Sequence, residues 1–259
     1  MINVDQNLLA QLRVIAERAG AVILQFYTDD IEVREKADSS PVTAADEAAE
    51  AVILAALAEL TPEVPIVSEE AFEAGKIPEV AGGPFWLVDP LDGTKEFISR
   101  NGEFTVNIAL IVEGRPVAGV VHAPALSRTW LGGAGKAVEI TGNEAPKAAA
   151  VRPVPEAGVT VVASRRHGSA EDLGPYLEGH GVADQVSAGS SIKFCLLASG
   201  EADLYPRFGR TMEWDTAAGQ AVLLAAGGEV IELDGRPFTY GKPGFENPHF
   251  VARGWKGGA

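Results

Sequence analysis

The chain has 259 residues, 46% of them hydrophobic, so it can bury a sizeable core in one large domain or in two packed halves. Its 21 Lys and Arg residues are outnumbered by 36 Asp and Glu residues, which gives a formal charge of −15. This charge argues against a surface built to bind a nucleic-acid polymer or anionic lipid. An anionic ligand would therefore need a cation within its own binding site.

The N-terminal segment, residues 1–20, has neither the basic stretch nor the uninterrupted apolar run of a signal peptide, and no segment is long enough to span a bilayer. We therefore expect a cytoplasmic protein without an integral membrane segment, which is compatible with peripheral association with the inner membrane.

The one cysteine, Cys195, excludes an internal disulfide and a cysteine-based metal cluster, and we expect its thiol to be buried in a helix.

Hydrophobic periodicity predicts the elements of the first half. An amphipathic helix ends near Tyr27, a short strand covers 31–35, a loop follows, and a second helix over 43–60 has Thr43 at its N-cap. Short apolar runs then predict strands that end at acidic residues. They lie in 64–70 and 84–90, as a pair within 104–125, and over 128–140.

A change of composition over 143–158 predicts a crossover between two halves, 1–150 and 151–259. In the second half, strands and helices alternate. The expected strands lie in 159–164, 181–189, 202–206 and 228–233, and the expected helices in 191–200 and 216–228. The pattern thus predicts a mixed α and β protein.

The segment VDPLDGTKEF, residues 88–97, places two aspartates around a proline directly after a predicted strand. Its aspartate, proline and glycine residues fit a β-turn, so turn propensity alone explains them. The same loop offers the carboxylates of Asp89 and Asp92 and, between them, the carbonyl oxygen of Leu91. Because Mg²⁺ binds carboxylate and carbonyl oxygens, the loop equally fits a metal site.

Two further acidic positions stand at comparable places. Glu69 follows a predicted strand in IVSEE, although this residue or Glu70 also suits a solvated loop. Asp215 begins a predicted helix in MEWDTAAG, where it also suits an N-cap. Four converging carboxylates would raise one another's pKa, so their convergence would imply cations. Two Mg²⁺ ions about 3.5–4 Å apart could share these ligands, an arrangement suited to phosphoryl transfer.

The residues after the turn suit the same chemistry. Where GTKEF opens a helix, the free backbone N–H groups of Gly93 and Thr94 would hold phosphate oxygens, and the Thr94 hydroxyl would hold a metal-bound water. Asp46 is the candidate general base or water-positioning carboxylate, although Thr43 and Asp46 also have the spacing of a capping box. The catalytic prediction therefore comprises Asp46, Thr94 and Glu69.

FWLVDPLDGTKEF, the upstream SEE and the downstream WDTAAG resemble the Mg²⁺-dependent, lithium-sensitive phosphatases of the inositol monophosphatase superfamily. The resemblance runs from SPVTAAD to AAGGEV and rests on three separated motifs in the same order. It implies a layered α-β-α-β-α sandwich with the site between two halves, and a possible homodimer. It assigns Thr94 and Asp46 to the attacking water. The implied ligands of two or more Mg²⁺ ions are Glu69, Asp89, Asp92, Asp215 and the Leu91 carbonyl.

Within the superfamily, residues 92–111 and 189–219 are more similar to the 3'(2'),5'-bisphosphate nucleotidases of the CysQ type. This implies hydrolysis of adenosine 3',5'-bisphosphate to AMP and phosphate. A second phosphate needs a cation, and arginine offers a bidentate fork. However, the position of Lys193 on a helix equally fits a solvated side chain with no role in binding, and the polar loop around His167 equally fits a surface histidine. The implied substrate-binding residues are Gly93, Thr94, His167, Ser190, Lys193, Arg207 and Asp215.

Two other functions fit the same residues. One is an inositol monophosphatase or a broad sugar-phosphate phosphatase; the other is a non-catalytic regulator that binds a nucleotide or metal. The acidic run SEEAFEAGK departs from the family pattern, which leaves the ligand role of Glu70 open. Lys36 and Asp38 precede Asp46 and would approach a further metal or close the site. The expected partner is a small phosphorylated molecule.

Overall fold

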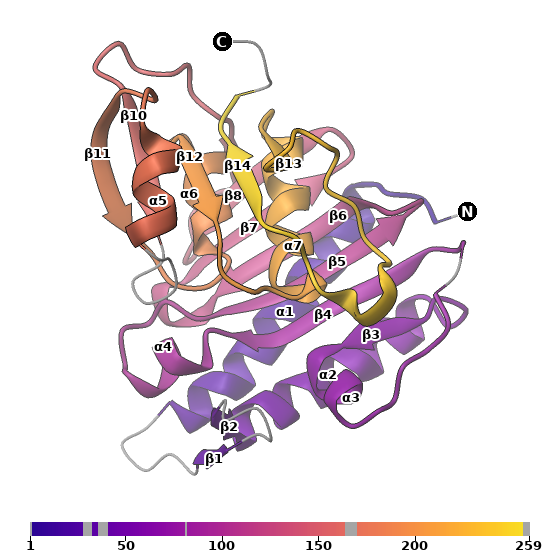
Figure 1. Ribbon diagram of the computed structural model, residues 1–259. Coiled ribbons are helices and arrows are strands. Elements are labelled where there is room, and N and C mark those ends of the chain that lie inside the picture. Colours follow the sequence, from indigo (N-terminus) through magenta and orange to yellow (C-terminus); the bar gives the residue numbers. More distant parts are fainter. Residues whose placement is uncertain (1, 28–32, 36–40, 81, 164–169, 256–259) are drawn as a thin grey trace.

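The computed structural model describes residues 2–27, 33–35, 41–80, 82–163 and 170–255. It contains a seven-stranded sheet in the order β3-β4-β5-β6-β7-β8-β9, a five-stranded sheet in the order β11-β10-β12-β14-β13, and the antiparallel pair β1 and β2 (Figure 1). The helices are α1 (Gln6–Phe26), α2 (Ala44–Leu60), α3 (Glu69–Glu73), α4 (Thr94–Ile98), η1 (Pro124–Leu126), α5 (Ala170–Leu177), α6 (Ile192–Ala198), α7 (Glu213–Ala225) and η2 (Pro243–Phe245). The strands are β1 (Val33–Glu35), β2 (Pro41–Thr43), β3 (Ile66–Ser68), β4 (Phe85–Asp92), β5 (Thr105–Val112), β6 (Arg115–Ala123), β7 (Arg128–Gly133), β8 (Lys136–Thr141), β9 (Lys147–Ala149), β10 (Val159–Ala163), β11 (Val182–Ser187), β12 (Leu204–Arg207), β13 (Glu229–Glu232) and β14 (Phe250–Arg253).

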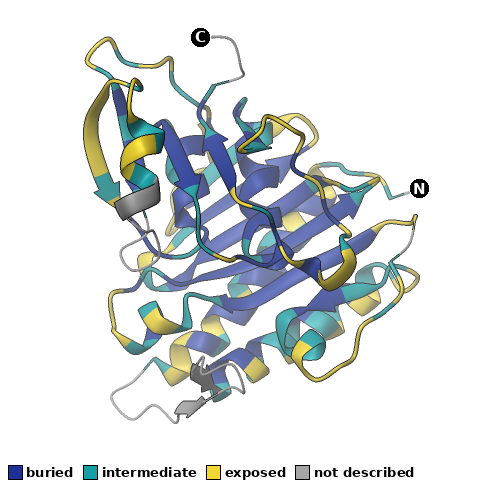
Figure 2. Cartoon of the chain, in the orientation of Figure 1, coloured by how far each residue is buried: buried dark blue, intermediate teal, exposed yellow. Residues whose placement is uncertain are grey.

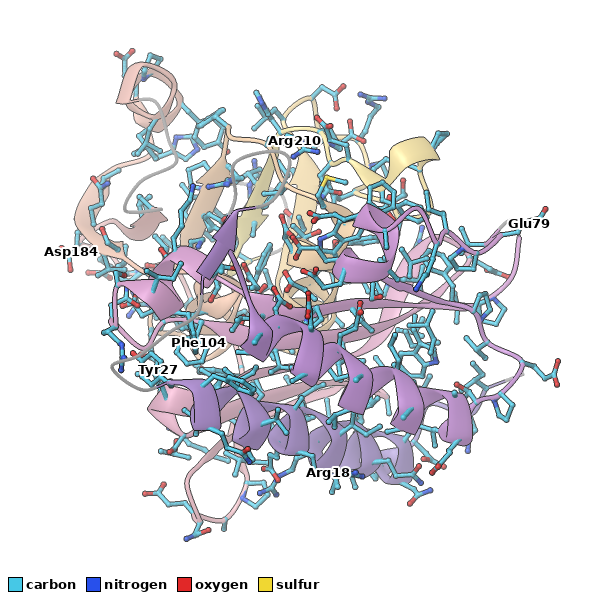
Figure 3. The ribbon with its side chains drawn as sticks, turned by 90° about the horizontal axis from the view of Figure 1, so that it is seen from below. Arg18, Tyr27, Glu79, Phe104, Asp184 and Arg210 are labelled. Carbon is cyan, nitrogen blue, oxygen red and sulfur yellow. The ribbon has the colours of Figure 1, made fainter. Side chains whose placement is uncertain are left out.

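The large sheet is buried on both faces, as Figure 2 shows. Side chains alternate along a strand, so in β4 Trp86 and Val88 join the core under α1 and α2, whereas Leu87 joins the core on the opposite face. This explains why FWLV reads as a continuous apolar run rather than an alternating one. Seen from below in Figure 3, α1, which carries Arg18, lies with α2 across the sheet; Tyr27 just beyond α1 meets Phe104, with ring centroids 5.0 Å apart.

The second core lies between the two sheets and contains α6 and α7. Phe194 of α6 packs against Tyr205 and Phe250 of the smaller sheet, and Val222 of α7 belongs to the same cluster. A third cluster, on the outer face of the smaller sheet, includes Tyr176 of α5. The layers are therefore α-β-α-β-α, and the expected fold class is confirmed (Figure 1).

Helix α7 approaches the large sheet closely enough to need glycine on the strands. A Cβ atom on Gly132 of β7 would lie 2.4 Å from the Cα atom of Val222, and one on Gly119 of β6 would lie 2.8 Å from the Cβ atom of Ala221. The two glycines therefore set the distance between sheet and helix. This distance matters because the first turn of α7 carries Asp215.

Several sequence expectations need correction. Strand β4 does not stop before Pro90 but continues to Asp92, because its register against β5 shifts between Asp89 and Asp92. The supposed turn is thus a bulge within a strand, and the bulge accommodates the proline. Strands β2, β9 and β14, helices α3 and α5 and the short helices η1 and η2 were not predicted. Of the helices described, none has both the length and the apolar character needed to cross a membrane.

Candidate active site

The bulge at the end of β4 presents its oxygen atoms toward the space beneath α7. Asp89 lies on the same strand face as Leu87, which packs in the core that contains α7. The backbone N–H of Leu91 donates to Asp89 Oδ1 at 3.1 Å, and the Leu91 side chain is buried in the core of α1 and α2. The Leu91 carbonyl accepts from the Thr94 hydroxyl at 3.4 Å. Local hydrogen bonds thus hold Asp89, Leu91 and Thr94 as one unit.

The chain then turns into α4 through Gly93, which is the N-cap and has a φ of 92°. This left-handed conformation favours glycine. A Cβ atom here would also lie 3.3 Å from the Cβ atom of Ser190, so there is little room for one. Glycine therefore allows the segment before α6 to approach the start of α4.

Two more carboxylates reach this region from other elements. Glu69 is the first residue of α3, directly after β3. Asp215 is the third residue of α7, not its N-cap as the sequence suggested; Met212 is the N-cap, and its backbone N–H donates to Asp215 Oδ2 at 2.8 Å. Asp215 therefore caps its helix and also faces the site.

The predicted residues from both halves line one cavity of about 260 Å³. Two predicted residues are not among its lining: Asp46, which is fully buried in α2, and Glu70. His167, Lys36 and Asp38 lie outside the described residues. The cavity is lined by Glu69, Asp89, Leu91, Asp92, Gly93, Thr94, Lys95, Glu96, Gly189, Ser190, Lys193, Phe194, Tyr205, Arg207, Thr211, Asp215 and Thr216.

The carboxylates at one end of the cavity repel one another. Burial raises the pKa of Asp89 well above its ordinary value, and the charges of Glu69, Asp92, Asp215 and Asp46 raise it further. Burial also raises the pKa of Asp215, with Asp92 and Glu69 adding to the shift. Carboxylate and carbonyl oxygens in this electrostatic setting are the donor set of a hard divalent cation, so these residues fit Mg²⁺.

The carboxylate groups of the site are not gathered around a single point. Within the ranges that the structure describes, no three carboxylate, imidazole or thiol groups are drawn together as they are around a bound ion.

Basic side chains line the same cavity. Lys193 of α6 is buried rather than solvated, with 5% exposure. Its ammonium donates to the carbonyl of Ala188 at 3.3 Å and lies 5.5 Å from the ring centre of Tyr205. Burial lowers its pKa to about 8, although the charge of Asp92 acts in the opposite direction and that of Arg207 lowers it further. Lys193 and Arg207 thus bring positive charge into the same cavity as the carboxylates, where Lys193 interacts with Asp92 and Arg207 with Asp215.

Several site residues were missed from the sequence. Asn107 of β5 donates to Asp92 and to Ser191, and Glu103 accepts from the backbone N–H of Gly189 at 2.7 Å and, through its carbonyl, from the Ser190 hydroxyl at 2.8 Å. A local signal pointed only to Asn107, a polar residue within the apolar run FTVNIALI; none pointed to Glu103. Their partners are far away along the chain, which hides the contacts from sequence patterns.

Comparisons with known proteins agree with the fold and the motifs. Residues 5–256 match the inositol monophosphatase family. The chain is 48% identical to the 3'(2'),5'-bisphosphate nucleotidase CysQ of Escherichia coli K12 over 248 residues, which cover 94% of this chain and 98% of that protein. It is 39% identical to CysQ of Buchnera aphidicola over 251 residues, which cover 92% and 89% of the two chains.

A solved structure gives the same result. The crystal structure of CysQ from Bacteroides thetaiotaomicron, described as a bacterial member of the inositol monophosphatase family, superposes with a TM-score of 0.80 at 37% identity and covers 96% of this chain and 97% of that one. The match spans both sheets and therefore all the elements that line the cavity. The chain belongs to the inositol monophosphatase family.

Proposed function

We propose that this phosphatase hydrolyses adenosine 3',5'-bisphosphate to AMP and phosphate. The observation that carries the proposal is the presence of two cations, Lys193 and Arg207, in the same cavity as the crowded carboxylates. A substrate with two phosphates can place one among the carboxylates, with their cations, and the other against these side chains. The names of the relatives at 48% and 39% identity support the same substrate class.

The family is one of metal-dependent phosphatases, and we propose Mg²⁺, in two or more positions, as the metal. Glu69, Asp89, Asp92, Asp215 and the Leu91 carbonyl would hold it. When bound, Mg²⁺ supplies positive charge that polarises the phosphoryl group and makes a water molecule more acidic. The donor set fits this ion because it consists of oxygen atoms and because burial and the crowding of negative charge raise the pKa of Asp89 and Asp215.

The residues beside the ligands have separate roles in this proposal. The Thr94 hydroxyl donates its one proton to the Leu91 carbonyl, which holds its position, and its oxygen accepts a hydrogen bond from the attacking water. Asp46, whose charge raises the pKa of Asp89, takes part in orienting the water and receiving its proton. Glu69 helps to hold the same water. The backbone N–H groups of Gly93 and Thr94 bind oxygens of the reacting phosphate.

The substrate's second phosphate and its nucleoside would lie against α6 and β12. The Lys193 ammonium and the Arg207 guanidinium neutralise that phosphate, and Ser190 stands beside them on the cavity wall. Lys193 is preorganised because it is buried and already held by the Ala188 carbonyl. We also propose that Asp215 contacts the substrate and that His167 takes part in recognition from its loop.

A phosphate-release panel tests the proposal. The purified chain is given adenosine 3',5'-bisphosphate, its sulfated analogue, AMP and inositol phosphates, with Mg²⁺ or with EDTA, and with or without Li⁺. We expect release from the two bisphosphate compounds, loss of release in EDTA, and inhibition by Li⁺. Faster release from inositol monophosphate would favour the inositol phosphatase alternative. Tight binding of the bisphosphate in calorimetry without release would favour a regulator.

The sequence pattern and the resemblance to the family together support three more proposals. We propose that the chain works as a homodimer in the cytoplasm, and that its halves, 1–150 and 151–259, each contribute one wall of the site. Light scattering would test assembly, because a mass near 27.1 kDa would contradict a dimer. Cell fractionation would test the location.

A further inference from the structure

Two buried residues connect the carboxylate of Asp92 to the backbone of Asp215, in the other half of the chain. Asn107 of β5 donates through Nδ2 to Asp92 Oδ2 at 3.2 Å and to the Ser191 hydroxyl at 3.0 Å. Ser191 precedes α6, and its hydroxyl donates to the carbonyl oxygen of Asp215 at 2.7 Å. Asn107 and Ser191 are each 1% exposed, so water does not compete for these hydrogen bonds.

Hydrogen-bond counting fixes the direction of this relay. A serine hydroxyl has one proton, and that of Ser191 is used on the Asp215 carbonyl. Ser191 must therefore accept from Asn107, which means that the amide nitrogen of Asn107 faces both Ser191 and the Asp92 carboxylate. The nitrogen has two protons, and each has an acceptor. The amide can take no other orientation without losing both contacts.

This orientation leaves one atom of the amide without a contact. Asn107 Oδ1 is buried and has no hydrogen-bond partner among the described residues. A buried unsatisfied acceptor costs about 1–3 kcal/mol, so an apolar side chain of the same shape would serve the core better. An asparagine at this position is therefore better explained by what its two donors hold than by its contribution to stability.

We propose that Asn107 and Ser191 are positioning residues for the metal site. Asn107 sets the rotation of the Asp92 carboxylate, which also accepts from the backbone N–H of Ser191 and, at a longer 3.5 Å, from the Thr105 hydroxyl. Ser191 ties the same amide to the first turn of α7 and so to the backbone of Asp215. The relay keeps a ligand on β4 and a ligand on α7 at the spacing that a divalent ion requires. The inference rests on the proposed function, because it takes both aspartates as metal ligands.

Mn²⁺ binding tests this inference without requiring turnover. Free Mn²⁺ is counted by electron paramagnetic resonance while the full-length chain, stripped with EDTA and dialysed, is titrated. We expect Asn107→Leu and Ser191→Ala to weaken Mn²⁺ binding by about 10- to 100-fold, as other residues that orient metal ligands do. Ser191→Thr keeps the hydroxyl and should restore most of the affinity. With substrate, the Mg²⁺ concentration for half-maximal activity should rise by the same factor.

Ser199→Ala is the matched control. Ser199 stands at the other end of α6, where its hydroxyl also bridges helix and sheet: it accepts from Trp130 Nε1 at 3.0 Å and donates to Glu139 Oε2 at 2.9 Å. This variant should lose thermal stability comparably to Ser191→Ala but keep wild-type Mn²⁺ affinity. If both serine variants lower Mn²⁺ affinity equally, the relay acts only through the fold, and the inference is overturned.

The remaining outcomes separate this inference from the proposed function. If the wild type binds Mn²⁺ but releases no phosphate from any bisphosphate, the substrate proposal fails, and the variants still test the relay. Wild-type Mn²⁺ affinity in folded Asn107→Leu and Ser191→Ala overturns the relay even if bisphosphate hydrolysis is normal. Absence of Mn²⁺ binding by the wild type overturns it as well. Circular dichroism and thermal melting establish that each variant is folded.

Discussion

The ring of Phe72 packs against the ring of Trp214, with centroids 5.1 Å apart. Phe72 belongs to α3, which begins at Glu69, and Trp214 belongs to α7, where it directly precedes Asp215. Phe245 of η2 adds a third ring at 5.9 Å from Phe72. This aromatic contact joins the two helices that bring carboxylates to the cavity from outside β4.

Phe72→Ala should loosen that connection. We expect a loss of about 2 kcal/mol in unfolding free energy, because a partly buried ring and its aromatic contacts disappear. The Mg²⁺ concentration for half-maximal activity should rise several-fold, since Glu69 and Asp215 are no longer held by a common contact. Thermal melting and a Mg²⁺ titration of phosphate release measure the two effects. Phe26→Ala, at an exposed ring on α1, is the control and should change neither quantity; an unaltered Mg²⁺ titration in Phe72→Ala would contradict the prediction.

Asp89→Asn should stabilise the metal-free protein. The substitution keeps an acceptor for the Leu91 N–H and removes one of several buried charges that repel one another. We expect a gain of about 1–3 kcal/mol in EDTA, seen as a melting temperature several degrees higher, together with loss of activity. In Mg²⁺ the wild type should have the higher melting temperature, because only the wild type is stabilised by metal binding.

The control for this charge effect is Asp184→Asn, at the exposed aspartate on β11 that Figure 3 labels. It should move the unfolding free energy by no more than about 0.5 kcal/mol in either solution. If the metal-free Asp89→Asn protein melts at a lower temperature than the wild type, repulsion among the carboxylates is not a dominant contribution to the unfolding free energy.

Lys193→Met should discriminate between substrates. Methionine fills a similar buried volume without charge, so the fold should persist, whereas a charge-assisted hydrogen bond to the second phosphate is lost. We expect KM for adenosine 3',5'-bisphosphate to rise by about 10- to 100-fold, the equivalent of about 1.5–3 kcal/mol. Hydrolysis of a substrate with one phosphate should change little. Lys147→Met, at an exposed lysine on β9, is the matched control; equal losses on both substrates would argue against a role for Lys193 in binding the second phosphate.

Gly132→Ala should damage the contact between sheet and helix. The new methyl group would lie 2.4 Å from the Cα atom of Val222, so α7 must shift outward and take Asp215 with it. We expect a loss of about 3 kcal/mol in denaturant unfolding and a fall in kcat. Gly83→Ala is the comparison, because nothing lies within 4 Å of a Cβ atom there. If the Gly132→Ala protein is as stable as the Gly83→Ala protein, α7 can move away from the sheet without loss of stability, and the prediction is wrong.

His122 should make stability depend on pH. Burial lowers its pKa from 6.5 to about 4; its Nδ1 shares a hydrogen bond of 2.8 Å with Thr129 Oγ1. Between pH 4 and pH 6.5 the unfolded chain therefore binds a proton at His122 that the folded chain does not bind. The unfolding free energy thus falls as the pH drops from 6.5 to 4. The contribution over this window is about 3 kcal/mol.

His122→Gln should remove that part of the pH dependence while keeping a polar group beside Thr129. Urea unfolding between pH 4 and pH 6.5 measures the difference between the two profiles. The wild type should lose more stability than the variant on acidification. Parallel profiles for the two proteins would mean that His122 titrates alike in the folded and unfolded chains.

Much of the secondary structure could be predicted because its signals are local. Helical spacing located α1, α2, α6 and α7, and apolar runs located most strands. Strands β9 and β14 were missed for different reasons: β9 is a short, largely exposed edge strand, and β14 follows a long irregular segment. At β4 the local rule for proline gave the wrong end of the strand, because the bulge depends on pairing with β5.

The order of the acidic motifs and the family were determined by the sequence alone, since they depend only on residue type and spacing. Tertiary structure decided which side chains are buried together. Lys193 could be solvated or buried by its helical position, and packing between two sheets buries it. Asn107 and Ser191 are 84 positions apart, and no local pattern joins them. Their contact exists because β5 and α6 pack in adjacent layers, and long-range packing has no signature in a short stretch of sequence.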